Sequence, residues 1–179
     1  LGLSGGIDSA VVACLAVDAL GPEAVTCFYL PGPFSTKKSE KLSHDFAKRL
    51  HIQSHDLWIS KIYNTTLAEL SKAIEIKKFG ITHENLQARI RALLLMGVGN
   101  QQNSLLLTTG NKSEYATGYT TLYGDMCGGL APIGDLLKEQ VYELAYHYNH
   151  QEEIIPSGII ERPPSAELRP NQKDSDSLP

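Results

Sequence analysis

The chain has 179 residues, a formal net charge of -4, and 42% hydrophobic and 20% charged residues. This length suits one domain with a hydrophobic core, and the composition is ordinary for a globular protein. The negative charge and the lack of any run of more than two Lys or Arg argue against a nucleic-acid surface. No apolar run approaches the ~20 residues of a membrane span, and no signal peptide opens the sequence, so we expect no membrane partner.

Cysteine usage indicates a reducing compartment. The three cysteines, Cys14, Cys27 and Cys127, are far apart and form no C-x-x-C pair. We interpret them as buried thiols of a cytoplasmic protein. The sequence begins without Met inside an expected strand and ends in a polar tail, so we expect a single domain over 1–179 that is part of a longer polypeptide.

The most informative stretch is Leu-Gly-Leu-Ser-Gly-Gly-Ile-Asp-Ser at 1–9, which leads from apolar residues through a Ser/Gly turn into an apolar helix. A strand-turn-helix of this kind directs backbone N–H groups and a helix N-terminus at the turn, which favours phosphate. Gly5 and Gly6 allow positive φ and a close approach of ligand to the backbone. The lysine of the common phosphate loop, G-x-x-x-x-G-K-[ST], is absent.

Asp8 stands at the start of this helix instead. One interpretation is a simple N-cap, which its residue type allows. A carboxylate beside polyphosphate is repulsive unless a cation lies between them, however. If the loop binds phosphate, Asp8 therefore predicts Mg²⁺, which takes carboxylate and phosphate oxygens together.

Strands and helices alternate along the following residues. Helices are expected at 9–20, 36–50, 82–102 and 135–148, with Asp135 as the cap of the last, and a weakly patterned helical region at 61–80. Strands are expected at 24–30, 52–59 and 104–109. This alternation predicts an α/β fold, a doubly wound parallel sheet with helices on both faces. Ligands bind outside the carboxyl ends of strands in such sheets.

Several polar residues lie at positions that suit this edge. Asn85 and Arg89 are four apart on one face of the 82–102 helix. Glu114 follows the 104–109 strand and is placed to supply a second carboxylate for the metal that Asp8 predicts. Lys138 lies in the first turn of its helix, where a cation is unfavourable, so an anionic partner is expected, with a surface lysine as the alternative.

Two segments have no clear period. Residues 115–130 hold four glycines and three tyrosines, a composition typical of functional loops. Pro and Ser are frequent at 156–179, which we expect to be extended or mobile, either a lid or a linker.

The 1–9 loop resembles the S-G-G-x-D-S loop of the ATP pyrophosphatases. Further stretches make the whole chain similar to the synthetase domain of the NAD synthetases, particularly the glutamine-dependent class. They are Glu-Asn-Leu-Gln-Ala-Arg-Ile-Arg at 84–91, Thr-Thr-Gly-Asn-Lys-Ser-Glu at 108–114, Tyr-Gly-Asp at 123–125 and Pro-Pro-Ser-Ala-Glu-Leu at 163–168. The first loop alone is common to GMP synthetase and tRNA-thiolating enzymes, whereas the later stretches narrow the family.

The resemblance implies a two-step ligase reaction. The nicotinate carboxylate of deamido-NAD attacks the α-phosphorus of ATP and releases pyrophosphate, and ammonia then displaces AMP to give NAD. Little covalent chemistry falls to side chains, so positioning and charge neutralisation carry the catalysis.

The resemblance also implies the site residues. Lys138 is the candidate catalytic residue, and Asp8 and Glu114 are the candidate Mg²⁺ ligands. The ATP-binding set is Gly2, Leu3, Ser4, Gly5, Gly6, Ile7, Asp8, Ser9, Thr109, Lys138 and Ser165. The set expected to bind deamido-NAD is Asn85, Arg89, Glu114 and Asp125.

Three departures from the family pattern bear on the partners. Leu122 and Gly129 stand where ammonia-dependent members carry Lys and Asp, which favours the glutamine-dependent class. The amidase domain that releases ammonia from glutamine is not in these residues, so the nitrogen source is free ammonia or an amidase domain elsewhere in the protein. Family chains also continue beyond 163–168 with further substrate-binding residues. A homodimer or larger homo-oligomer is expected by resemblance alone.

Two alternatives remain open at this stage. Another ATP pyrophosphatase amidotransferase, such as a GMP-synthetase-like enzyme, would have the same first loop and a different acceptor pocket. A non-enzymatic nucleotide-binding or assembly module would bind ATP without forming AMP.

Overall fold

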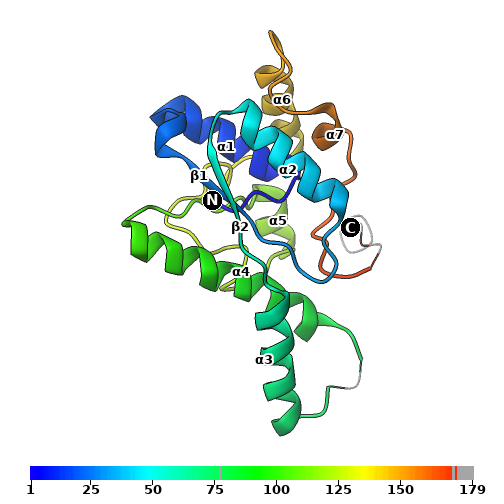
Figure 1. Cartoon of the computed structure of the whole chain (residues 1–179). Coiled ribbons are helices and arrows are strands. Elements are labelled where there is room, and N and C mark those ends of the chain that lie inside the picture. The colour runs from blue at the N-terminus through cyan, green and yellow to red at the C-terminus, as the bar shows by residue number, and fades with distance from the viewer. Residues whose placement is uncertain (77, 171, 173–179) are drawn as a thin grey trace.

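A computed structural model describes residues 1–76, 78–170 and 172 of the chain (Figure 1). Its elements, in chain order, are α1 (Ile7–Leu20), the 3-10 helix η1 (Pro22–Ala24), β1 (Thr26–Tyr29), α2 (Lys37–Arg49), β2 (Gln53–Asp56), α3 (Ser60–Ala73), α4 (Ile81–Gln102), α5 (Lys112–Thr117), α6 (Lys138–Tyr148) and α7 (Ser157–Ile160).

β1 is the centre of the sheet. It pairs in parallel with β2, in a register that runs from Thr26–Gln53 to Tyr29–Asp56. On its other side Gly2 forms a parallel bridge with Phe28. Two backbone hydrogen bonds form that bridge. Leu3 N–H donates to Phe28 O at 2.8 Å, and Phe28 N–H donates to Leu1 O at 3.0 Å. Residues 1–3 thus run parallel to β1, as expected for a strand at this position. They form only this one bridge and no full strand.

The two faces of β1 belong to two hydrophobic clusters. Val25 and Cys27 pack with α1, α2 and α6 in the larger cluster. Phe28 and Leu30 pack with α3 and α4 in the smaller one. Successive strand residues point to opposite faces, so a nearly continuous apolar run serves both clusters. The predicted α/β fold, with a parallel sheet and helices on both faces, is confirmed.

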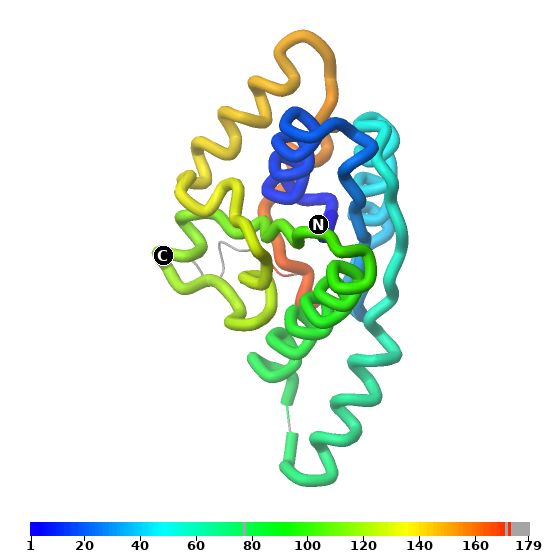
Figure 2. Tube along the Cα trace, turned by 90° about the vertical axis from the view of Figure 1, so that its left-hand side faces the viewer, coloured from blue at the N-terminus to red at the C-terminus, as the bar shows by residue number. Residues whose placement is uncertain are grey.

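The helices end close to their expected positions. α1 is apolar on nearly all sides and is buried between the sheet and α6, as a helix without a polar face must be. α3, by contrast, has one buried residue, Tyr63, and projects from the rest of the molecule in both ribbon views (Figures 1 and 2). The weak pattern at 61–80 is explained by this exposure.

Two expected features differ from the structure. The strand expected at 104–109 is reduced to a single parallel bridge between Leu107 and Leu130. Gly128 and Gly129 immediately precede Leu130. A side chain at Gly128 would lie 2.8 Å from the Thr108 nitrogen, so the close approach of the two segments requires glycine there. The last long helix begins at Lys138 rather than at Asp135.

The cap of α6 comes from within the helix. The Gln140 side-chain oxygen accepts a hydrogen bond from Leu137 N–H at 2.8 Å. Asp135 lies in the preceding turn instead. The third helical residue thus makes a one-way contact with the N-cap backbone, which residue types alone do not reveal.

The expected extended segment at 156–179 includes a helix. α7 occupies Ser157–Ile160, and its Ile159 side chain is buried in the larger cluster with Ile155. The adjacent Ile159 and Ile160 are both buried, and their apolar surface holds this short helix against the core. Residues 161–170 are extended or bent, and residues 171 and 173–179 of the segment lie outside the described residues.

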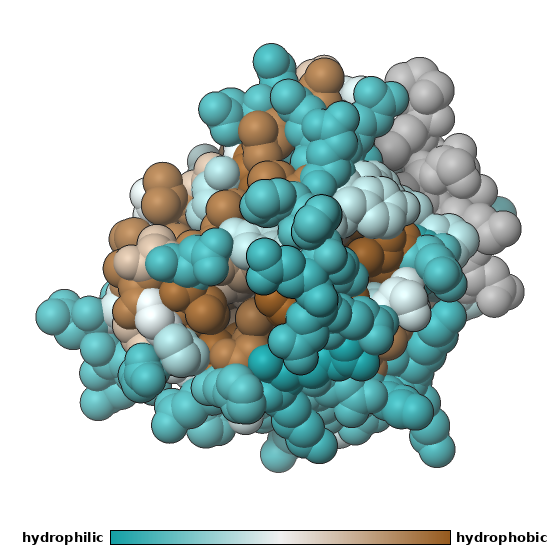
Figure 3. Space-filling model, turned by 90° about the horizontal axis from the view of Figure 1, so that it is seen from above, coloured by the Kyte–Doolittle hydropathy of each residue, from teal (hydrophilic) through white to brown (hydrophobic). Residues whose placement is uncertain are grey.

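The surface agrees with the composition. The face seen from above is largely hydrophilic, with apolar side chains showing in patches between polar ones (Figure 3). No helix in the described part of the chain is long and apolar enough to cross a membrane. All three cysteines are free thiols. Cys14 and Cys27 are buried as expected, whereas Cys127 is only partly buried.

Candidate active site

A cavity of about 270 Å³ lies where the first loop, the end of β1 and the segment after Leu107 meet. Twelve of the predicted site residues line it, namely Gly2, Leu3, Ser4, Gly6, Ile7, Asp8, Ser9, Thr109, Glu114, Asp125, Lys138 and Ser165. Gly5, Asn85 and Arg89 do not. Residues as far apart in sequence as Gly2 and Ser165 thus converge at the carboxyl end of the sheet, where α/β folds bind ligands.

The hydroxyl groups of Ser4 and Ser9 hold the first loop in shape. Ser9 Oγ accepts from Ser4 N–H at 3.2 Å and lies 3.1 Å from Ser4 Oγ, and it donates to Gly6 O at 3.0 Å. Gly6 N–H donates to Ser4 Oγ at 3.2 Å. The loop is therefore closed on itself before any ligand arrives, which lowers the entropy lost on binding.

Gly5 is required by both its conformation and its surroundings. Its φ of 76° is left-handed, and an added Cβ would lie 2.7 Å from the backbone oxygen of Ser39 in α2. Ile7, Asp8 and Ser9 then form the first turn of α1, whose N–H groups have no acceptor within the helix. These N–H groups face the cavity end of a 14-residue helix, which suits an anion.

Asp8 is not the N-cap of α1. Gly6 occupies that position, and the Asp8 carboxylate is turned toward other elements. One oxygen accepts from Asn111 Nδ2 at 2.9 Å, and the other is bonded to Lys138 Nζ. The interpretation of Asp8 as a simple cap is wrong, and Lys138 has the anionic partner that its place in the helix predicted.

Lys138 is positioned by its own backbone as well. Its N–H donates to Ser113 Oγ at 3.0 Å, which fixes the start of α6 against the start of α5. The Lys138 and Asp8 side chains are 24% and 20% exposed, so their ion pair is partly shielded from water yet remains open to the cavity. A cation and an anion are thus held side by side in the cavity.

Glu114 carries an unfavourable charge. Its Oε2 accepts from Asn111 N–H at 3.0 Å, while Asn111 Oδ1 accepts from Glu114 N–H at 3.0 Å, which is the capping box of α5. Burial, together with the negative charge of Asp8, raises the pKa of Glu114 to about 7. The charge of Asp8 thus disfavours ionisation of Glu114, and a cation between the two carboxylates would relieve this effect.

The residues present fit Mg²⁺. Within the described residues, no group of three or more His, Cys, Asp or Glu is arranged to hold a metal. Mg²⁺ does not need such a group, because it is commonly bound by one or two carboxylates together with water and substrate phosphates. Asp8 and Glu114 provide that number beside a phosphate-type loop.

Asp125 shapes the opposite wall of the cavity. Its carboxylate accepts from Thr121 N–H at 2.7 Å, and its backbone oxygen accepts from Thr108 Oγ1 at 2.5 Å. The second contact ties the 115–130 segment to the residue before Thr109. Residues 115–117 continue α5, so the expected irregular loop begins only at Gly118 and the prediction is wrong for its first three residues. This segment, expected to be a functional loop, therefore forms one side of the cavity.

Asn85 and Arg89 lie beyond that wall. Asn85 Oδ1 accepts from Thr121 Oγ1 at 2.8 Å, and Arg89 Nε donates to Leu122 O at 3.1 Å. They share a helix face, as their spacing predicts, and both hold the 115–130 segment from outside. The Leu122 side chain is exposed, as is Gly129.

Sequence reasoning missed several residues of the cavity. Arg91 lines it and donates from Nε to Leu30 O at 2.9 Å, and burial lowers its pKa to about 10. Arg162 and Glu167 line it as well and form an ion pair. The second Arg of the 84–91 stretch was a visible signal for Arg91, since a spacing of two residues on a helix turns its side chain away from that of Arg89 and toward the sheet. Nothing local marked Arg162.

The whole chain, residues 1–179, matches the family model described as NAD synthase. The glutamine-dependent NAD(+) synthetase of Aquifex aeolicus is 51% identical over 179 residues, which are 100% of this chain and 32% of that protein. The corresponding enzyme of Synechocystis is 49% identical, with 100% and 32% covered. The chain spans about a third of the length of the curated relatives it matches.

Solved structures agree. Glutamine-dependent NAD+ synthetase from Acinetobacter baumannii in complex with ADP has a TM-score of 0.88 and 40% identity, over 93% of this chain and 32% of that one. NMN synthetase from Francisella tularensis has a TM-score of 0.88 and 31% identity, over 98% and 69%. With the family model covering every residue, the chain belongs to the NAD synthase family.

Proposed function

We propose that this chain is the ATP-dependent, amide-forming part of an NAD synthetase. In the first step an oxygen of the nicotinate carboxylate of deamido-NAD bonds to the α-phosphorus of ATP, and the α–β phosphoanhydride bond breaks to release pyrophosphate. In the second step ammonia bonds to the activated carboxyl carbon, the bond to the AMP oxygen breaks, and nitrogen loses a proton. The products are NAD, AMP and pyrophosphate.

The observation that carries the proposal is the cluster of Asp8, Lys138 and Glu114 beside the first loop. The loop offers backbone N–H groups, and the cluster offers one cation and two carboxylates within a single cavity wall. Such a set suits a polyphosphate with its metal ion. It is supported by the relative from Acinetobacter baumannii, whose structure holds ADP.

Each residue of the cluster has a part in this mechanism. The N–H groups of residues 5–9 and the Ser4 hydroxyl hold the β- and γ-phosphates, and Thr109 and Ser165 contact the nucleotide from the other walls. Lys138, held at its place by Asp8, neutralises charge that moves onto the leaving pyrophosphate. Asn111 keeps Asp8 turned away from the helix.

Mg²⁺ is part of the proposal, with Asp8 and Glu114 as its ligands. When bound, the ion would withdraw charge from the phosphate oxygens and keep the leaving group in line. Ionised Glu114 is needed for this, and the cation would restore its ionisation near neutral pH.

The acceptor side rests on Asn85, Arg89 and Asp125, with Glu114 between the two substrates. In this structure Asn85 and Arg89 contact the 115–130 segment, so deamido-NAD would bind along the outer side of that segment. Since relatives are about three times as long as this chain, further acceptor contacts come from segments outside it in our proposal.

Partners are proposed on the same basis. The high identity to glutamine-dependent enzymes favours an amidase domain as the ammonia source, and a homodimer of the complete protein. Free thiols at all three cysteines favour the cytoplasm. A GMP-synthetase-like activity is not favoured by the family match.

The test uses the full-length protein with ATP, Mg²⁺, deamido-NAD and ammonium, following NAD, AMP and pyrophosphate together. Equal amounts of all three are expected. Parallel reactions replace ammonium with glutamine, or deamido-NAD with nicotinate mononucleotide or xanthylate. Turnover of either replacement acceptor without turnover of deamido-NAD would reject the proposed acceptor, and ATP binding without AMP formation would reject the ligase reaction altogether.

A further inference from the structure

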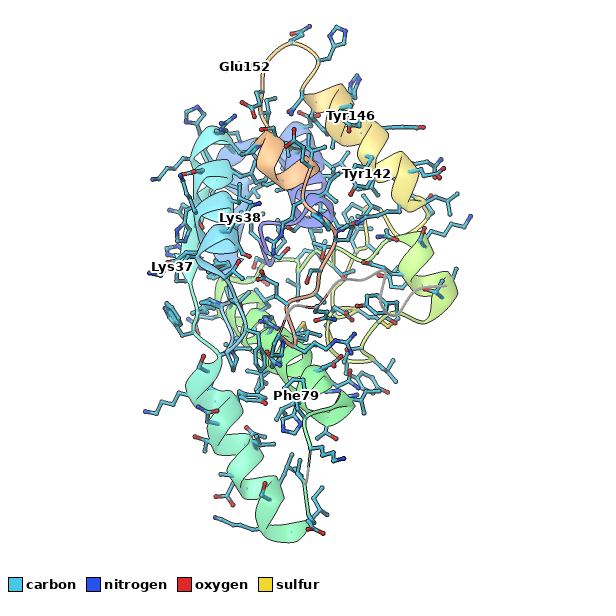
Figure 4. All side chains as sticks on the ribbon, turned by 90° about the vertical axis from the view of Figure 1, so that its right-hand side faces the viewer. Lys37, Lys38, Phe79, Tyr142, Tyr146 and Glu152 are labelled. Carbon is cyan, nitrogen blue, oxygen red and sulfur yellow. The ribbon has the colours of Figure 1, made fainter. Side chains whose placement is uncertain are left out.

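Residues 162–168, which we call the strap, form one wall of the cavity. The strap follows α7, passes the first turn of α2 and reaches α4. Figure 4 shows this course, from α7 past the turn marked by Lys37 and Lys38 toward the start of α4 near Phe79. A segment without regular structure needs side-chain contacts to stay in one place.

Glu167 supplies most of these contacts. Its Oε1 accepts from Ser39 Oγ at 2.7 Å and from Thr36 Oγ1 at 3.0 Å, and it pairs with Arg162. Arg162 donates in turn to Ser39 Oγ at 2.9 Å. One carboxylate oxygen therefore joins the beginning of the strap, its end and the N-terminus of α2.

This anchor is buried and conformationally costly. The Glu167 and Arg162 side chains are 15% and 16% exposed. Glu167 has a φ of 49°, in the left-handed region that non-glycine residues rarely adopt. Ser39 itself is fully buried. Such a backbone persists only where the side chain over-determines it, so loss of the carboxylate would release the strap.

The backbone of Glu167 also acts on Ser165. Its N–H donates to Ser165 Oγ at 3.2 Å. A hydroxyl has one proton and two lone pairs, so this contact occupies an acceptor position and leaves the Ser165 proton for a ligand in the cavity. Ser165 is the one strap residue that we place on the nucleotide.

The far end of the strap is fixed independently. Leu168 O accepts from Gln87 Nε2 at 2.9 Å, and Leu168 N–H donates to Gln172 Oε1 at 2.8 Å. Arg91 lies behind the strap, and the charge of Glu167 opposes the fall in the pKa of Arg91 that burial causes. Freeing Glu167 would thus loosen residues 162–167 while Leu168 stays attached to α4.

We propose that Glu167 is a positioning residue for ATP, which anchors the strap to α2 and orients Ser165 toward the nucleotide. The inference rests on the proposed function, because it assumes that ATP occupies this cavity. Glu167 acts through Ser165 and the strap, so it contributes to nucleotide affinity and not to the chemical step.

The test compares Glu167→Ala and Glu167→Gln with the matched control Glu161→Gln. The Glu161 side chain is exposed and lies one residue before the strap. Full-length enzymes are assayed for kcat and for the KM of ATP, and the Kd of ATP is measured by calorimetry without acceptor. Loss of a buried, paired carboxylate should raise KM and Kd of Glu167→Ala about 10- to 100-fold and leave kcat within about threefold.

Glu167→Gln should raise the KM and Kd for ATP by about 3- to 10-fold, less than Glu167→Ala does. The new amide oxygen still accepts from Ser39 and Thr36, but the amide does not neutralise Arg162. The control should match wild type. If Glu167→Ala does not fold, Ser39→Ala, which removes one donor to the same oxygen, takes its place.

An unchanged Kd and KM for ATP in the folded variants would overturn the proposal, and so would a fall in kcat with KM unchanged. The proposed function fails separately. If the wild type makes no NAD, the Kd of ATP still decides the role of Glu167, whereas a wild type that binds no ATP overturns both.

Discussion

The proposed phosphate end and the proposed acceptor end of this site, which we call the phosphate end and the acceptor end, are built in different ways. At the phosphate end, the first loop closes on its own hydroxyl groups and leads into α1, which is among the most buried helices of the fold. At the acceptor end, Asn85 and Arg89 hold an irregular segment whose Leu122 and Tyr123 side chains are 56% and 72% exposed.

The difference indicates which part of the reaction this chain can position alone. Adenylation depends on fixed charges around phosphate, and these charges lie on buried, hydrogen-bonded elements. Acceptor binding depends on a surface that is open here. We therefore expect substitutions at the phosphate end to lower kcat, and substitutions at the acceptor end to raise KM for deamido-NAD.

The largest effect is expected from Asp8→Asn. Removing this charge weakens the proposed Mg²⁺ site and releases Lys138, so exchange of labelled pyrophosphate into ATP should fall on the order of 10²- to 10³-fold. Asp18→Asn, on the same helix, is the control, because its side chain accepts from Tyr148 at the far end. Normal exchange in Asp8→Asn would show that the phosphate end does not depend on this carboxylate.

Lys138→Met should follow, with a loss of about 10²-fold in kcat and a smaller change in the KM of ATP. The exposed Lys112→Met is the matched control, since Lys112 begins the neighbouring helix α5. A double variant with Asp8→Asn should be little worse than Asp8→Asn alone, because the two residues act as a pair. Fully additive losses would mean that each acts separately.

Arg89→Ala tests the acceptor end. Loss of its contact with Leu122 O should raise the KM for deamido-NAD about tenfold and leave ATP–pyrophosphate kinetics at saturating acceptor nearly unchanged. Gln102→Ala, at the exposed end of the same helix, serves as reference. Should kcat fall instead, the division between the two ends would not hold.

The last prediction concerns stability and its dependence on pH. The pKa of Glu114 is about 7 in the fold and near 4.5 as an ordinary carboxyl, so the folded state retains a proton that the unfolded chain releases. This contribution is fully present below about pH 4.5 and is lost as pH rises to about 7. Without metal, wild type should therefore lose on the order of 3 kcal/mol over that range relative to Glu114→Gln.

Urea unfolding in EDTA at several pH values measures this difference. The amide of Glu114→Gln can still accept from Asn111 N–H, so the capping box is kept. Glu139→Gln, an exposed site on α6, should show the same pH dependence as wild type. Parallel curves for wild type and Glu114→Gln would exclude the raised pKa.

The sequence predicted the parts of the fold that depend on local pattern. Apolar periodicity located α1, α2 and α4, and the first loop with Asp8 was visible as a motif. The 104–109 strand was overestimated, because an apolar run shows only that residues are buried and not whether a neighbouring segment can pair with them. The cap of α6 was misassigned for a similar reason, since Gln140 acts from inside the helix.

Contacts between residues that are distant in sequence could not be predicted from local patterns. The ion pair of Asp8 with Lys138 joins residues 130 positions apart. The sequence predicted only that Lys138, which lies in the first turn of its helix, has an anionic partner, and it did not identify that partner. The contacts of Glu167 with α2 and the burial of Arg91 had no local signal of comparable strength, because each depends on how separate elements meet.

The place of Gly5 against α2 has a consequence for how this fold can vary. The backbone of Ser39 leaves no room for a side chain at Gly5, its hydroxyl holds Glu167, and one turn later Ser43 Oγ donates to Leu3 O at 3.0 Å. One face of α2 therefore sets the positions of both the first loop and the strap, which form two walls of the cavity. We therefore expect a replacement of Ser39 to disturb the first loop and the strap together, and not one wall of the cavity alone.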